Sequence, residues 1–174
     1  TNALIANKVK VMLLFGTNIL SSFADSNRLA EGLARTDLIV SHDLFMQDTT
    51  RRYADVVLPA TAWLEQIGCK MTNTHLYFLE QALTPPGKVR PISWVLRQLA
   101  QRLQVDEFFP WTNDEEMINA ILDHPSTGHV TIADLRAEGG MRALNISHIG
   151  HPTHSYSTPS KKVEFFSERA QELG

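Results

Sequence analysis

The sequence KVKVMLLF, at residues 8–15, ends in an unbroken apolar run that Gly16 stops. A run without polar alternation is typical of a strand buried on both faces, as in a parallel sheet. Two further apolar stretches, DLIVS at residues 37–41 and DVVLP at residues 55–59, have the same character. A proline, which cannot continue a ladder of hydrogen bonds, ends the last of them. We therefore expect three strands of one sheet.

A helix is expected between the first two strands, at about residues 26–35. Asp25 or Ser26 can cap it, and Leu29 and Leu33 lie one helical turn apart. The order strand, helix, strand, short crossover, strand is that of a doubly wound α/β unit. The sequence therefore predicts an α/β fold with a mainly parallel sheet.

The turn TPPG at residues 84–87 marks a candidate domain boundary, after extended chain at residues 71–83. We expect the α/β unit to span residues 1–83 and a mostly helical and loop part to span residues 84–174. Its expected elements are a helix capped by Ser93 with Trp94, Leu96, Leu99 and Leu103 on its apolar face, a helix capped by Thr112 or Asn113, a helix at 131–138, a loop at 144–160, a short strand at 162–166 and a weak last helix.

Composition restricts the classes of function. Apolar residues make up 43% of the 174 residues, charged residues 20%, and the net charge is -3, as in a folded protein that is soluble as it stands. The basic residues are scattered, which argues against nucleic acid as a partner. The longest apolar run is far too short to cross a bilayer. Because Cys69 is the only cysteine, this chain can hold neither an internal disulfide nor a four-cysteine iron–sulfur cluster.

Two groups of residues follow strand ends, where ligands bind in open α/β sheets. Gly16-Thr17-Asn18 could approach a phosphate, although any tight turn in an α/β protein needs such residues. At the end of the second strand, the carboxylate of Asp43 could accept two hydrogen bonds from the N1–H and 2-amino groups of guanine. Asp43 could equally cap the following turn. His42 beside it is expected to be a hydrogen-bonding wall residue.

Two other groups favour a structural interpretation. Trp63, Glu65 and Gly68 form a cluster in which the carboxylate is expected to bond a backbone amide. His148, His151 and His154 have a helical spacing that could suit a metal, but the proline among them opposes a helix. We expect no metal site there.

Taken together, these pieces resemble the molybdopterin-dependent oxidoreductases of the dimethyl sulfoxide reductase family. The resemblance rests on five stretches: FGTN at 15–18, HDLFMQDTTRRYADVVLPATAWLEQIG at 42–68, TN at 72–73, TPPG at 84–87 and TPSKKVEFFSE at 158–168. It implies a piece of a bacterial large catalytic subunit, with a C-terminal barrel beyond residue 174. In such enzymes two molybdopterin guanine dinucleotides (bis-MGD) hold one molybdenum or tungsten.

The resemblance also implies roles for seven residues. Gly16, Thr17 and Asn18 would line the phosphate or ribose region, His42 and Asp43 would contact guanosine, and Ala60 and Gln66 are weaker correspondences. Ile92 departs from the pattern, because many relatives have an aspartate there near the nucleotide. The metal ligand and any iron–sulfur cysteines belong upstream, so no catalytic residue and no metal ligand is assigned, and the chain alone is expected to be inactive.

Partners and alternatives follow from the same resemblance. The remaining domains of the catalytic subunit and electron-transfer subunits are the expected partners, in the cytoplasm or the periplasm. One alternative is a cofactor-free structural domain of the same lineage in a respiratory complex. Another is a self-contained nucleotide-binding protein, which the missing G-x-G-x-x-G pattern disfavours.

Overall fold

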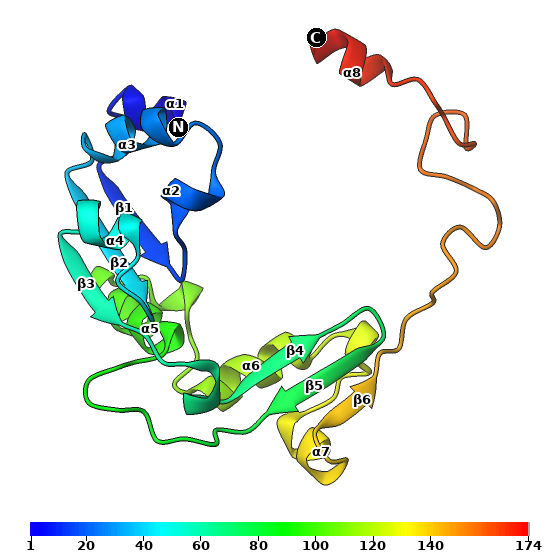
Figure 1. Cartoon of the computed structure of the whole chain (residues 1–174). Coiled ribbons are helices and arrows are strands. Elements are labelled where there is room, and N and C mark those ends of the chain that lie inside the picture. Colours follow the sequence, from blue (N-terminus) through cyan, green and yellow to red (C-terminus); the bar gives the residue numbers. More distant parts are fainter. Residues whose placement is uncertain (174) are drawn as a thin grey trace.

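Two hydrophobic clusters, each beside its own three-stranded sheet, organise the chain in the computed structural model, which describes residues 1–173 (Figure 1). The first sheet contains β1 (Val11–Phe15), β2 (Leu38–Asp43) and β3 (Val56–Pro59), all parallel and in the order β1-β2-β3. The expected α/β fold with a parallel sheet is confirmed. The strands advance in one direction across the sheet, as in one half of a doubly wound fold.

Short helices precede and connect these strands. The helix α1 (Asn2–Ile5) precedes β1, α2 (Ile19–Ser22) and α3 (Ser26–Leu33) lie between β1 and β2, and α4 (Asp48–Tyr53) lies between β2 and β3. The carboxylate of Asp25 accepts a hydrogen bond from the backbone N–H of Arg28 and so caps α3, as the sequence predicted. The side chains of Leu14, Leu33 and Ile39 are almost fully buried in the first cluster, between the sheet and these helices.

One prediction for this sheet is wrong, because its strands are not covered on both faces. Val11, Leu13, Leu38 and Val56 share one face by register and alternation, and all are exposed. No described segment packs over that part of the face. The unbroken apolar run therefore predicted the position of the strand correctly, but not the exposure of one of its faces.

The second sheet is antiparallel and has the order β4-β5-β6. It contains β4 (Gly68–Met71), β5 (His75–Leu79) and β6 (Met141–Ala143), and the 3₁₀ helix η1 (Trp63–Glu65) leads into it. The side chains of Leu76 and Phe78 pack with α6 (Asp114–Leu122) and α7 (Ile132–Ala137) in the second cluster. Residues 68–79 thus pack with chain beyond the turn at 84–87. The division into domains at residue 83 stays a prediction.

The long helix α5 (Ile92–Leu103) forms where expected but begins differently. Its N-cap residue is Pro91 and not Ser93, which lies inside the first turn with its hydroxyl buried and without a hydrogen-bond partner. The buried side chains of α5 include Val95, whereas Leu103 is 68% exposed. Two 3₁₀ helices follow, η2 (Asp106–Phe108) and η3 (Pro125–Thr127). The cap of α6 by Asn113 agrees with the sequence, and α7, which Thr131 caps, lies within the helix expected at residues 131–138.

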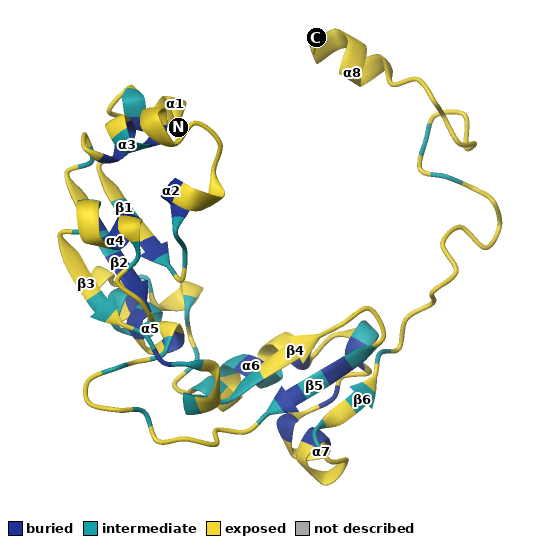
Figure 2. Ribbon diagram, viewed as in Figure 1, coloured by how far each residue is buried: buried dark blue, intermediate teal, exposed yellow. Residues whose placement is uncertain are grey.

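Residues 146–167 run away from the two clusters and lead to α8 (Glu168–Leu173), and almost all of this tail is exposed (Figure 2). The strand expected at residues 162–166 is absent from the described chain, because no described strand pairs with it; the side chain of Phe165 is fully exposed. Within residues 1–173, no helix is both long enough and apolar enough to span a membrane.

Candidate nucleotide-binding site

A cavity of about 420 Å³ lies at the carboxyl ends of the parallel strands. Strand ends meet there because all three strands run the same way, so residues distant in sequence share one edge of the sheet. Its lining includes Gly16 after β1, His42 and Asp43 at the end of β2, and Ala60 after β3. The others are Phe15, Leu44, Phe45, Gln47, Thr61, Gln66 and Ile92.

Asp43 is a buried carboxylate in the wall of this cavity, with 8% of its surface exposed. Its Oδ1 accepts a hydrogen bond from the backbone N–H of Phe45 at 3.2 Å, and its Oδ2 accepts one from Nε2 of Gln47 at 2.8 Å. Asp43 therefore caps the turn after β2, as one interpretation of the sequence held. A carboxylate has about four acceptor positions, so the capping bonds leave others available for a ligand.

His42 is buried and holds the chain before α5 in place. Its Nε2–H donates to the carbonyl oxygen of Arg90 at 2.8 Å, because a carbonyl can only accept. The imidazole also meets the ring of Phe15 edge to face, with centroids 5.9 Å apart. A parallel bridge between Ala60 and Arg90 joins the same segment to the end of β3. His42 is thus a hydrogen-bonding wall residue, as expected.

The loop after β1 divides into two parts. Gly16 lines the cavity with a positive φ of 56°, and a Cβ added there would meet no atom within 4 Å. Asn18 instead fixes the loop to α4, because its Oδ1 accepts a 2.7 Å hydrogen bond from the hydroxyl of buried Thr49. Neither Thr17 nor Asn18 is part of the cavity lining. The structure therefore gathers Gly16, His42, Asp43, Ala60 and Gln66 around one space.

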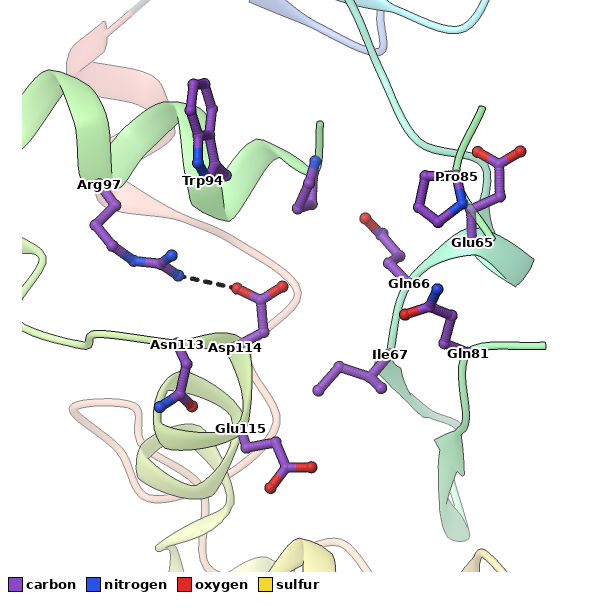
Figure 3. A pocket seen from close by; sticks show the side chains of 11 residues that line it. Glu65, Gln66, Ile67, Gln81, Pro85, Trp94, Arg97, Asn113, Asp114 and Glu115 are labelled. Atoms are coloured by element: carbon purple, nitrogen blue, oxygen red, sulfur yellow. Dashed lines mark hydrogen bonds and ion pairs between the residues drawn. The ribbon is translucent and has the colours of Figure 1, made fainter. Parts of the chain in front are cut away.

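Gln66 also lines a second cavity, of about 550 Å³ (Figure 3). This cavity lies between residues 65–85 on one side and the helices α5 and α6 on the other. Its Oε1 accepts a 2.5 Å hydrogen bond from the hydroxyl of Thr61. The carboxylate of Glu65 next to it accepts a bond from the backbone N–H of Ala62, which is the structural role expected for Glu65. On the side of the second cavity away from Gln66, Arg97 and Asp114 form an ion pair with an N–O distance of 3.0 Å. Only Gln66 belongs to both linings.

Sequence reasoning missed the loop residues that complete the first cavity. Phe45 is 72% exposed and lies beside Asp43, and the amide of Gln47 contacts the Asp43 carboxylate. The available signal was weak: an aromatic and an amide residue close after a strand-end aspartate. Ile92 also lines the cavity, at the position where the resemblance had suggested an aspartate.

The other candidates lie outside this cavity. Partial burial raises the pKa of the Cys69 thiol, and Cys69 lines neither cavity. His151 bonds the backbone oxygen of Ser155 in the exposed tail. Among residues 1–173, no three histidine, cysteine, aspartate or glutamate side chains are grouped to hold a metal ion.

Comparison with known proteins decides the family. The family model described as molybdopterin oxidoreductase matches residues 1–102, more than half of the chain, including every residue of the first cavity. The chain belongs to the molybdopterin oxidoreductase family. The resemblance recognised in the sequence is thereby confirmed.

Relatives of this molybdopterin oxidoreductase chain differ in their activities. Acetylene hydratase of Syntrophotalea acetylenica is 30% identical over 95% of the chain, which spans 23% of that relative. The probable oxidoreductase YoaE of Bacillus subtilis is 31% identical over 95%, and the chain spans 25% of it. A nitrate reductase of Klebsiella oxytoca is 32% identical over 64% of the chain and 13% of its own length. The chain thus spans a quarter or less of these relatives.

A solved structure has the same arrangement. Acetylene hydratase from Pelobacter acetylenicus superposes with a TM-score of 0.79 at 27% identity. The match covers 99% of the present chain and 24% of that structure. It therefore includes both sheets and the tail, and it supports the fold of the molybdopterin oxidoreductase chain as a whole.

Proposed function

We propose that this segment binds the guanosine end of one arm of a bis-MGD cofactor in a molybdenum or tungsten enzyme. The observation that carries the proposal is the single cavity lined by Gly16, His42, Asp43, Ala60 and Gln66 at the carboxyl ends of β1, β2 and β3. The bound metal and its dithiolene ligands would supply oxygen-atom or two-electron transfer. The residues of this chain would hold and orient the nucleotide.

The residues in the cavity fit such a nucleotide. Asp43 offers two carboxylate oxygens, which match the adjacent N1–H and 2-amino donors of guanine. Gly16 has no side chain to obstruct a phosphate or ribose, and the space around its Cα is open. A volume of about 420 Å³ lies within the usual range for small-molecule sites. Thr17 and Asn18 do not line the cavity, and Asn18 would contribute by holding the loop against α4 through its bond to Thr49.

The reaction itself would be decided elsewhere in the enzyme. The relatives include a nitrate reductase, an F420-dependent formate dehydrogenase and an acetylene hydratase, all similar over this same region. A shared nucleotide-binding segment accounts for that variety. We propose that the other domains of the catalytic subunit supply the metal ligand and any iron–sulfur cluster, and that electron-transfer subunits are partners where the reaction needs them.

A second function is favoured by a different observation. Both oxygens of Asp43 and the Nε2–H of His42 already have partners within the chain. A domain that had lost its cofactor would satisfy its buried polar groups in this way. The alternative is therefore a structural domain of the same lineage in a respiratory complex, which would bind no guanine nucleotide.

Analysis of the protein that carries this segment, purified from its native host, separates the two. We expect about one molybdenum or tungsten and about two GMP per chain, by mass spectrometry of the metal and of nucleotide released with mild acid. Folded protein with neither would overturn the cofactor proposal and support the structural domain.

The contribution of Asp43 is tested by Asp43→Asn, which keeps the size but replaces one acceptor by a donor that opposes guanine. We expect binding of GDP to this chain to weaken about tenfold or more, because hydrogen bonds to a charged partner are strong. Asp37→Asn is the matched control, since Asp37 is exposed and directly precedes β2, at the end of the strand opposite to Asp43. Equal GDP affinity in Asp43→Asn and unaltered protein would contradict the assignment.

A further inference from the structure

Gln47 is a polar residue in the lining of the cavity proposed to bind guanosine, and it has had no role assigned so far. Its backbone oxygen accepts the hydrogen bond from Arg51 that begins α4, but its side chain does not cap that helix. The recorded side-chain bond of Gln47 is instead the 2.8 Å contact from Nε2 to Oδ2 of Asp43. The side chain is partly buried and lines the cavity with Asp43. Its amide is therefore directed to the carboxylate that would contact the base.

Two internal donors fix the plane of the Asp43 carboxylate. The backbone N–H of Phe45 bonds Oδ1, and the amide of Gln47 bonds Oδ2. Because each carboxylate oxygen has two lone pairs, one remains free on each oxygen. The two free lone pairs form a coplanar pair of acceptors. A carboxylate held in one plane can meet a ligand edge that presents two parallel donors side by side.

We propose that Gln47 is a positioning residue that makes the cavity selective for guanine over other purines. This inference rests on the proposed binding of guanosine at Asp43. Guanine presents N1–H and a 2-amino group side by side, hypoxanthine lacks the amino group, and adenine presents an acceptor at N1. A carboxylate fixed by Gln47 accepts both guanine donors at once. Without Gln47 the carboxylate turns about its last torsion, which is broad, and the second donor loses its partner.

The neighbouring contacts explain why Gln47 and not another residue has this role. Phe45 acts through its backbone, so no side-chain substitution removes its hydrogen bond. His42 is occupied by the carbonyl oxygen of Arg90, and Gln66 by the hydroxyl of Thr61. Among the described residues, Gln47 is thus the side chain that donates to Asp43.

The test compares GDP, IDP and ADP, titrated into the chain by calorimetry. Unaltered protein is expected to bind GDP about tenfold more tightly than IDP, the worth of one additional hydrogen bond to a carboxylate. In Gln47→Met, which keeps the length but removes the donor, the ratio of GDP to IDP affinity should fall to within about twofold of one, with IDP affinity nearly unchanged. Gln47→Leu should behave in the same way. Gln101→Met, on the exposed side of α5, is the control.

The outcomes distinguish this inference from the function on which it rests. If unaltered, folded protein binds none of the three nucleotides, both the proposed function and the role of Gln47 are overturned. If it prefers GDP and Gln47→Met keeps the same ratio, only the role of Gln47 is overturned. An equal loss of GDP and IDP affinity also overturns it, because a merely structural residue would weaken both ligands alike. A selective loss for GDP supports it.

Discussion

Thr49 is the residue on which the loop after β1 depends. It is fully buried, its hydroxyl accepts a hydrogen bond from the backbone N–H of Leu20, and it donates to Asn18. The hydroxyl therefore joins α2, the loop and α4. Its contribution is to stability and to the position of Gly16, which precedes Asn18 in the same loop.

We predict that Thr49→Val lowers the free energy of unfolding by about 1–3 kcal/mol, because it leaves the N–H of Leu20 buried without a partner. Urea unfolding followed by circular dichroism measures this. Thr84→Val is a suitable control, since Thr84 is exposed in the turn before α5 and has no recorded side-chain bond. Similar losses in the two variants would show that the buried network contributes little.

Single residues were predictable where strand ends determine their position. Asp43 and His42 could be placed because the carboxyl ends of parallel strands share one edge. Gln47 and Phe45 could not, because their positions depend on the path of the loop. Asn18 was placed in the correct loop but lies behind the cavity, because its side chain bonds Thr49.

At the scale of elements, β1 has one packed face and one exposed face. Leu14 is 4% exposed within the first cluster, whereas its neighbour Leu13 is 43% exposed on the other face. We predict that Leu14→Ala costs about 2–5 kcal/mol of unfolding free energy, while Leu13→Ala costs less than about 1 kcal/mol. Chemical denaturation of the two variants provides a matched comparison. Equal costs would show that both faces of β1 are packed in solution.

The start of α7 gives a prediction about pH. Hydrogen bonds from the hydroxyl and N–H of Thr131 lower the pKa of Asp134 below its ordinary value of 3.8. A carboxyl whose pKa is lower in the folded state stabilises the fold above its unfolded pKa, and this contribution is lost as the pH falls through the folded pKa. Asp134→Asn should therefore be less stable than unaltered protein at pH 7, and the difference should shrink below about pH 3.8.

Urea unfolding at a series of pH values measures that difference. Asp106→Asn serves as the control, because Asp106 lies at the start of η2 and has no recorded side-chain hydrogen bond. A difference that stayed constant from pH 7 to pH 2 would contradict a role for the charged form of Asp134.

Elements with strong local signals were predictable, and those that need a distant partner were not. The cap residues Asp25 and Asn113 gave correct helix starts. Strand β6 was missed because it exists through pairing with β5, far away in the sequence. The strand predicted at residues 162–166 was wrong because its local alternation is present, but the described chain offers no strand to pair with it.

At the scale of the whole molecule, the two hydrophobic clusters share no residue, and α5 and the surrounding loops connect them. The cavity that we propose to bind guanosine lies at the end of the first sheet. A ligand stabilises most strongly the part of a protein that must be folded to bind it. Nucleotide binding should therefore act unequally on the two parts.

We predict that GDP slows amide hydrogen exchange in β1, β2 and β3 more than in α6 and α7. Hydrogen exchange followed by mass spectrometry, with and without saturating GDP, resolves the two regions. The same measurement on Asp43→Asn should show little change in either region. Equal protection of both by GDP would indicate that the clusters unfold as one cooperative unit.

The pairing of β5 with β6 has a consequence during synthesis on the ribosome. His75 pairs with Ala143, so one edge of β5 has no neighbour until residues 141–143 have been made. At about 5–20 residues per second, that wait is on the order of several seconds. During this interval Leu76 and Phe78, which the finished fold buries against α6 and α7, remain open to water. A chaperone that recognises apolar extended segments would therefore find a target in the nascent β4–β5 hairpin.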